Sequence, residues 1–209
     1  MNNDEALLSD EHMDFLREIM NVGAGNAATA LSQLLNGQVE MKIPSVRILP
    51  ALKLVTIFDD PAFPVACVKM SLVGDMRGVL LFVLPEKNKA DIIRLAEKTI
   101  TGKTTKDSGH DISALSEIGN IVAGVYLTSI HDFCKLNIYH SVPSLAIDMV
   151  NAIIEEVIAD VSRSTASIIV IENEFEIVGK KINAFLLIIP PVEFVKILTD
   201  AMKKALPGQ

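Results

Sequence analysis

The chain has 209 residues, of which half are apolar and 22% are charged. A chain this apolar can bury enough surface to offset the entropy cost of folding, which excludes a largely disordered protein. Acidic residues outnumber basic ones, 26 to 19, and the formal net charge is −7. This balance disfavours a nucleic-acid binder, because phosphate backbones are bound by clustered Lys and Arg. The longest apolar stretches, residues 78–85 and 184–192, fall short of the ~20 residues of a membrane-spanning helix, so we expect no membrane insertion.

The first half of the chain predicts one long helix followed by strands. Apolar residues recur at helical spacing from Glu11 to Asn36, and Asp10 is a candidate N-cap. Runs rich in Val, Ile and Leu predict strands over residues 38–43, 53–58, 65–72 and 78–84, with a hairpin turn at Gly74 and Asp75. An amphipathic helix is expected over residues 86–101.

The second half follows a polar, linker-like segment at residues 103–109. A second long helix is predicted from Asp111 to Leu136, then a short strand and a helix within residues 144–162. A hairpin over residues 168–178 and 181–189 precedes a closing helix over residues 192–205. Strands come in adjacent groups, without regular alternation with helices. This order predicts an α+β fold with a mostly antiparallel sheet, on which the two long helices pack.

An internal repeat relates the two halves at an offset of 99 residues. Residues 14–21 (DFLREIMN) align with residues 113–120 (SALSEIGN), and the same offset relates Thr29 to Thr128 and Ile48 to Ile147. We therefore predict a single domain, residues 1–209, made of two repeats at about 11–102 and 110–206. The two long helices are then equivalents about a pseudo-two-fold axis.

Each long helix carries a stripe of polar residues on one face. A helix turns about 100° per residue, which puts Asp14, Glu18 and Asn21 together. The second copy does the same with its own trio: Ser113, Glu117 and Asn120. Gly25 and Gly124 continue the two stripes. Because Gly is a poor helix former, these positions indicate close approach by another helix or by a partner's backbone.

The alternative interpretation of these stripes is an ordinary solvated helix face, since Glu and Asn are common there. Duplication also preserves residues that are only structural. The observation that favours a site is a repeated spacing. Asn21 precedes Pro44, and Asn120 precedes Pro143, by 22 intervening residues in each case.

The pattern Asp/Ser-x-x-x-Glu-x-x-Asn, followed after 22 residues by Pro, resembles the signature of the CheC, CheX and FliY phosphatases. Two copies of Glu-Ile-x-Asn-x-x-Ala-Gly resemble the CheC branch most closely, and the resemblance covers essentially the whole chain. Two departures are small. Met20 stands where this class commonly has Gly, and Val125 replaces the equivalent of Asn26.

The resemblance implies that the substrate is the aspartyl phosphate of the receiver protein CheY. Asn21 and Asn120 would hold the attacking water, since an amide both donates and accepts hydrogen bonds. Glu18 and Glu117 would dock the receiver through its lysine. The receiver would bring its own Mg²⁺, so no cofactor or metal site is expected in this chain. Supporting roles fall to Asp14 and Ser113 on the helices and to Pro44 and Pro143, which would shape the turn leading away from each site.

The resemblance also implies binding of CheD, a receptor-modifying deamidase. The implied region is a helix around residues 146–154, with Asp148 and Met149 as candidate contacts beside the apolar Ile153 and Ile154. The alternative is an ordinary amphipathic helix packed on the sheet.

Three functions are thus compared. The first is a CheY phosphatase, the second is an adaptor of the same fold that sequesters CheD or phosphorylated CheY, and the third is a dinucleotide-binding enzyme. The third is disfavoured, because the G-x-G-x-x-A match at residues 23–28 lies inside a helical pattern with no preceding strand. We expect a cytoplasmic monomer: the N-terminus lacks a leader, no dimer seam is evident, and Cys67 and Cys134 have the apolar neighbours of buried free thiols, with a disulfide as the alternative.

Overall fold

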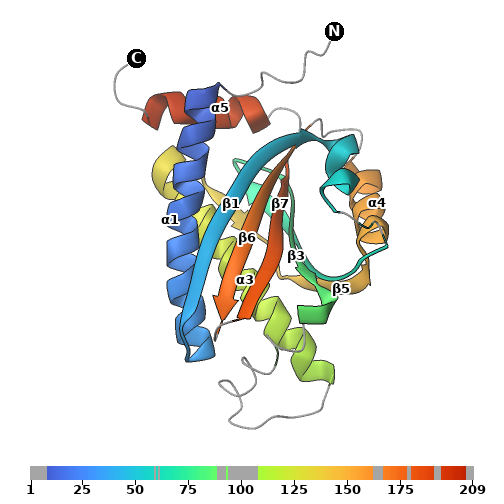
Figure 1. Cartoon of the computed structure of the whole chain (residues 1–209). Coiled ribbons are helices and arrows are strands. Elements are labelled where there is room, and N and C mark those ends of the chain that lie inside the picture. Colours follow the sequence, from blue (N-terminus) through green and yellow to red (C-terminus); the bar gives the residue numbers. More distant parts are fainter. Residues whose placement is uncertain are drawn as a thin grey trace.

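Apolar strands flanked by amphipathic helices form three layers in the computed structural model (Figure 1). The structure describes residues 9–58, 60, 62–88, 93, 108–161, 167–177, 180–190 and 194–205. The first half contains α1 (Asp10–Leu35), β1 (Val39–Pro50), the 3₁₀ helix η1 (Ala51–Ile57), β2 (Pro64–Gly74) and β3 (Gly78–Pro85). The second half contains α3 (Ser108–Cys134), β4 (Ile138–His140), β5 (Ser144–Met149), α4 (Val150–Val161), β6 (Ser167–Ile177), β7 (Lys180–Ile189) and α5 (Phe194–Ala205).

The sheet has the order β1-β6-β7-β3-β2-β4, and β5 also pairs with β2. Each of these pairings is antiparallel, which confirms the predicted α+β class. The central pair joins β3 of the first half to β7 of the second. The outer strands are exchanged: β1 pairs with β6 of the second half, and β4 and β5 pair with β2 of the first. The two halves are therefore interleaved in one sheet.

β3 and residues 184–189 of β7 are continuously apolar because both faces of the sheet are covered there. One face packs under α1, α3 and α5, with side chains such as Leu80, Phe82 and Leu186 in the core. The other face packs under α4 and η1, with Leu81 and Leu187 among its buried residues. In Figure 1, α1 and α3 lie on one side of the sheet and α4 on the other.

The two long helices were predicted nearly at their observed ends. Ser9, one residue before the expected cap, is the N-cap of α1, and its hydroxyl accepts a hydrogen bond from the backbone N–H of His12. α1 ends at Asn36, which adopts a positive φ of 45°. The residue 99 positions later, Lys135, follows α3 and has a φ of 57°. Both helices thus stop in the left-handed conformation, and a strand begins three residues further on.

Two predictions for the connecting segments need correction. Residues 53–58 were expected to form a strand, yet η1 occupies residues 51–57, because β1 runs on to Pro50 and the chain then crosses to the other face of the sheet. Leu54 is fully buried there against that face. The linker-like residues 108 and 109 already belong to α3. Most of the predicted helix over residues 86–101 lies outside the described residues.

Candidate functional site

The polar stripe of α1 faces away from the core. Asp14, Glu18, Asn21 and Gly25 are exposed. The opposite face of the helix is buried against the sheet and α3 through Leu16, Ile19, Met20, Ala24 and Ala27. This division follows from the 3.6-residue period, since the buried positions recur three or four residues apart.

The stripe of α3 has the same arrangement. Ser113 and Glu117 are exposed, and Asn120 is half-buried. Its opposite face is buried through Leu115, Ile118, Val122, Ala123 and Tyr126. Gly119, at the position of Met20, is buried as well, so both residues lie off the stripe as predicted.

The four central polar side chains are available for a partner. Within the part of the chain that the structure describes, Glu18, Asn21, Glu117 and Asn120 make no side-chain hydrogen bond or ion pair. Each pair occupies successive turns of its helix, so a carboxylate and a carboxamide lie side by side and open to solvent. Asp14 differs, because its carboxylate accepts a 2.6 Å hydrogen bond from Arg17 one turn further on. Such an exposed pair supports the helix only weakly.

The two stripes form separate sites, because the helices run antiparallel. Phe15, near the start of α1, contacts Phe133 at the end of α3, with ring centroids 6.1 Å apart. Gly23 lies against Tyr126 in the middle of the pair. Asn21 and Asn120 are therefore offset along the pair by about two helical turns. The structure brings Glu18 together with Asn21 and Glu117 together with Asn120, and it does not merge the pairs.

The glycines of the stripes do not serve helix–helix contact. A Cβ on Gly25 would meet no other atom within 4 Å, and a Cβ on Gly124 would meet only Nε2 of His140, at 3.6 Å. Close helix contact is made instead by Gly23, whose Cβ would lie 2.8 Å from the ring of Tyr126. Of the two reasons considered for Gly25, only approach by a partner remains open.

The two repeated prolines, Pro44 and Pro143, lie in different local structures. The prediction that Pro44 shapes a turn is wrong. Pro44 lies inside β1, where the register with β6 shifts between Lys42 and Ser45. Proline has no backbone N–H to donate, so it is tolerated in an edge strand at such a bulge. Pro143 lies in the break between β4 and β5. Both prolines thus interrupt the edge strand that follows a long helix.

The region implied for CheD binding is also different from its prediction. Residues 146–149 belong to the edge strand β5, and helix α4 begins only at Val150. Asp148 and Met149 are exposed at the end of this strand. Ile153 and Ile154 are buried against the sheet and cannot contact a partner. The helical pattern covered residues 146–149 because the sequence shows no break before Val150.

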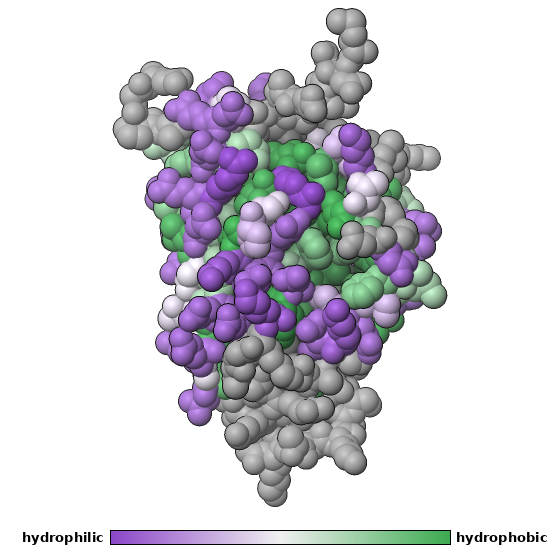
Figure 2. Space-filling view, in the orientation of Figure 1, coloured by the Kyte–Doolittle hydropathy of each residue, from purple (hydrophilic) through white to green (hydrophobic). Residues whose placement is uncertain are grey.

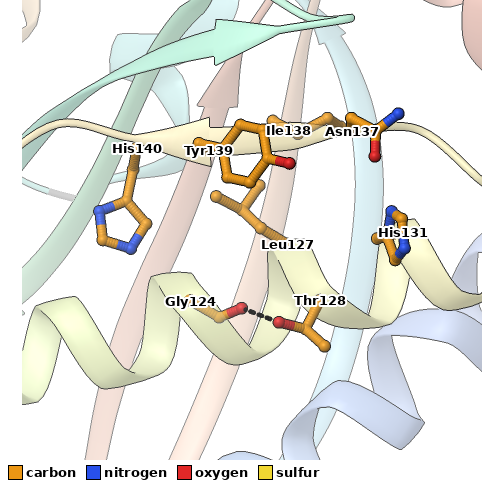
Figure 3. A pocket seen from close by; sticks show the side chains of 8 residues that line it. All are labelled: Gly124, Leu127, Thr128, His131, Asn137, Ile138, Tyr139 and His140. Carbon is orange, nitrogen blue, oxygen red and sulfur yellow. Dashed lines mark hydrogen bonds between the residues drawn. The ribbon is translucent and has the colours of Figure 1, made fainter.

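A hollow of about 360 Å³, not predicted from the sequence, lies between α3 and β4 (Figure 3). It adjoins the second stripe, since Gly124 lines it one turn after Asn120. Its walls include Leu127, Thr128 and His131 from α3 and Tyr139 and His140 from β4. The signal in the sequence is a pair of histidines, His131 and His140, on either side of the end of a long helix.

The described residues contain no candidate metal site and no reactive thiol. No group of three or more His, Cys, Asp or Glu side chains gathers there in a way that could hold a metal ion. Cys67 and Cys134 are buried free thiols. Burial raises the pKa of Cys67 to about 12 and that of Cys134 to about 11. Neither is a nucleophile near neutral pH, because the thiolate is the reactive form. Among the helices described, none is long and apolar enough to cross a membrane.

Comparisons with known proteins find a family model that matches a segment in each half of the chain. The model of the CheC-like family matches residues 11–48 and 112–147, which contain both Glu–Asn pairs. Over 172 residues the chain is 37% identical to the CheY-P phosphatase CheC of Bacillus subtilis (strain 168), a match that covers 79% of this chain and 80% of that protein. The chain belongs to the CheC-like family. The resemblance predicted from the sequence is thereby confirmed.

Solved structures show the same fold at lower sequence identity. The crystal structure of Thermotoga maritima FliY superimposes with a TM-score of 0.72 at 23% identity, over 95% of this CheC-like chain and 99% of that one. A chain of the CheX–CheY–BeF₃–Mg²⁺ complex from Borrelia burgdorferi gives a TM-score of 0.50 at 15% identity, over 83% of this chain and 98% of that one.

Proposed function

We propose that this CheC-like protein is a phosphatase that hydrolyses the aspartyl phosphate of the response regulator CheY, with one active site on α1 and one on α3. The observation that carries the proposal is the pair of Glu–Asn couples at the surface, each free of intrachain partners in the described part of the chain. Glu18, Asn21 and Glu117 are exposed, and Asn120 is half-buried. Membership of a family whose Bacillus subtilis relative is a CheY-P phosphatase supports it.

In this mechanism Asn21 or Asn120 holds a water in line with the phosphorus. The amide accepts a hydrogen bond from the water through its oxygen and remains neutral beside the phosphoryl group. Water attacks phosphorus, and the bond from phosphorus to the aspartate oxygen breaks. The products are inorganic phosphate and a free aspartate carboxylate on the receiver. No covalent intermediate on this chain is needed, so the contribution of the amide is positioning.

Glu18 and Glu117 have the wrong sign to contact a phosphoryl group directly. Each is instead proposed to form an ion pair with a lysine of the receiver beside its phosphorylated aspartate, and so to fix the register of docking. The Mg²⁺ that neutralises the phosphoryl charge belongs to the receiver, and this chain is proposed to need no cofactor of its own. A Mg²⁺ ion accompanies CheY in the Borrelia complex.

We also infer that the two sites arose by duplication of a half-domain. The family model matches one segment in each half, and the helix ends at Asn36 and Lys135 have the same left-handed conformation. Thr29 and Thr128 also make equivalent bonds, donating to the carbonyl oxygens of Gly25 and Gly124 at 3.0 and 2.8 Å. Duplicated sites predict additive activity, since each half carries its own couple.

The decisive experiment measures phosphate release from phosphorylated receiver by the wild type, by Asn21→Ala and Asn120→Ala singly, and by the double variant. Each single variant should retain part of the activity, and the double variant should lose it by about 100-fold, the scale of misplacing a reactant. Thr29→Ala is a matched control, because Thr29 is exposed on α1 and lies outside both couples. A folded double Asn variant that still accelerated release would contradict the mechanism.

The second candidate function is an adaptor that sequesters CheD or phosphorylated CheY with little turnover. It is favoured by the edge formed by β4 and β5, where exposed apolar side chains gather: Tyr139, Val142, Ile147 and Met149. We propose that this edge, with Asp148, is the CheD-binding surface. Met149→Glu should abolish capture of CheD and leave phosphate release by the enzyme alone unchanged. Unaltered CheD binding by that variant would place the partner elsewhere.

The proposed setting is a cytoplasmic monomer. Two buried free cysteines fit a reducing compartment, and two sites on one chain remove the need for a dimer to supply a second. Light scattering of the purified protein tests the monomer, and a mass of twice the chain would contradict it.

A further inference from the structure

The hollow beside α3 distinguishes the second stripe from the first. It opens one helical turn beyond Asn120, at Gly124, and continues past Thr128 toward the end of the helix. Figure 3 shows His140 projecting from β4 toward α3, and His131 projecting from α3 toward β4. Because Gly124 has no side chain, the floor of the hollow next to Asn120 remains open.

The walls of the hollow combine apolar surface with hydrogen-bonding groups. Leu127, Ile138 and the ring of Tyr139 supply the apolar part. None of the eight described residues that line the hollow is an acid, a lysine or an arginine. A side chain that enters this space therefore meets no carboxylate, ammonium or guanidinium group among these residues.

The hydrogen-bond pattern of His140 defines what the hollow accepts. Its Nδ1 lies 3.0 Å from the carbonyl oxygen of Ser141, which can only accept, so Nδ1 carries the proton and donates. In the neutral ring, Nε2 is then an acceptor. That atom stands over Gly124, 3.6 Å from where a Cβ would be. His131 has the same pattern, with Nδ1 donating to the carbonyl oxygen of Leu136 at 3.1 Å.

We propose that this hollow is a docking subsite for the receiver that is bound at Glu117 and Asn120. It takes a mainly apolar side chain with a hydrogen-bond donor at its end, such as a tyrosine of the receiver, whose donor meets Nε2 of His140. This proposal rests on the proposed phosphatase function. Its occupant is the receiver because the hollow is continuous with the second stripe along one face of α3.

The first stripe offers no equivalent group. The positions 99 residues before Tyr139 and His140 are Glu40 and Met41. Met41 packs against the core, and the space over Gly25 is empty to 4 Å. The subsite therefore predicts that the two sites bind the same receiver with different affinity, the second more tightly.

The test isolates the second site in an Asn21→Ala background and fills the hollow with Thr128→Phe. Thr128 is exposed on the wall of the hollow, so a larger side chain occupies the space without entering the core. KM for phosphorylated receiver should rise by about fivefold or more while kcat changes less than about twofold, the signature of lost uniform binding. The matched control is Thr29→Phe in an Asn120→Ala background, which should leave both constants unchanged.

A second variant tests the acceptor itself. His140→Phe keeps an aromatic side chain and removes both ring nitrogens, Nε2 and the Nδ1 that bonds to Ser141. It should raise KM by about threefold in the Asn21→Ala background. Affinity for receiver loaded with beryllofluoride, measured with the same variants, should weaken in parallel and does not depend on turnover. Unchanged KM and affinity in a folded Thr128→Phe protein, or an equal effect of Thr29→Phe, would overturn the subsite. Full activity of the Asn21→Ala, Asn120→Ala double variant would instead overturn the phosphatase mechanism.

Discussion

The two halves of the molecule present the same couple on equivalent helices and differ in the strand that follows. After α1, β1 extends from Val39 to Pro50 as one strand with a bulge at Pro44, and Glu40 and Lys42 lie near its start. After α3, the chain forms β4 and β5 with a gap between them, and Tyr139 takes the place of Glu40. The helix alone therefore positions the paired Glu and Asn side chains, and the strand determines which residues surround them.

The same contrast holds for the two edges of the sheet. On the β1 edge, Arg47 pairs with Glu172, and Lys181 pairs with Glu174 at 3.1 Å on the neighbouring strands. Figure 2 shows hydrophilic residues gathered over this part of the face. On the other edge, Tyr139 is 63% exposed and Met149 is 52% exposed. Charged edges resist pairing with another chain, whereas apolar ones invite it, so the edge formed by β4 and β5 is the one suited to a protein partner.

The largest effect on stability is expected where the halves differ in the core, at Met20 and Gly119. Met20→Ala removes a fully buried side chain and should cost about 2–5 kcal/mol of unfolding free energy. Gly119→Ala places a Cβ 2.9 Å from the side chain of Val68 and should cost about 1–3 kcal/mol through overpacking. Denaturant unfolding measures both. If Met20→Ala lowered the free energy of unfolding by less than Gly119→Ala, the contribution of Met20 to the core would be smaller than its full burial indicates.

A smaller effect on stability is expected at two glycines of α1, Gly23 and Gly25, where the same substitution should act in opposite directions. Gly23→Ala should destabilise the protein by about 1–3 kcal/mol, because the new Cβ meets the ring of Tyr126. Gly25→Ala meets open space and should stabilise it by up to about 1 kcal/mol through helix propensity. If the receiver approaches closely at Gly25, the stabilised variant should also turn over more slowly in the Asn120→Ala background. Thermal unfolding and phosphate release together distinguish these results.

Substitution of the two glutamates, Glu18 and Glu117, compares the two proposed sites through their KM for the receiver. Glu18→Gln in the Asn120→Ala background should raise KM by about five- to tenfold and weaken the dependence of KM on salt, as expected for a docking charge. Glu117→Gln in the Asn21→Ala background should raise KM by a similar factor from a lower starting value, since independent contacts contribute additively to the free energy of binding. Steady-state kinetics at low and high salt measures both, and equal starting KM values for the two sites would remove the asymmetry.

The smallest effect concerns the thiols, one in each half. At about pH 8, Cys67 and Cys134 should react with iodoacetamide far more slowly in the folded protein than in denaturant, because so little thiolate forms. Burial raises the pKa of Cys67 from 9.0 to about 12. The protonated thiol therefore favours the folded state below pH 9, and this contribution is lost as the pH rises from about 9 toward 12. Mass spectrometry of the alkylated protein measures how fast the thiols react. Unfolding curves across that pH range measure the loss of stability.

The sequence predicted the helices and the polar stripes well because both are local properties. Glu18 and Asn21 share a face through helical spacing alone, and the repeat at Glu117 and Asn120 marked them as a pair. Element types were less reliable where apolar runs are short. Residues 53–57 and 146–149 are both short and mostly apolar, yet the first segment belongs to η1 and the second to β5. A short apolar run fits a strand or a helix equally, and its neighbours in space decide between them.

Periodicity, turn residues and an internal repeat were sufficient to establish the α+β class, the two long helices and the four side chains of the paired couples. Assembly of the sheet decided the rest: the exchange of β1 with β4 and β5 between the halves, the bulge at Pro44, and the hollow between α3 and β4. These features depend on which segments meet across long separations in the chain. The imidazole of His140 lies over Gly124 only because β4 pairs with β2 and holds the strand across the end of α3.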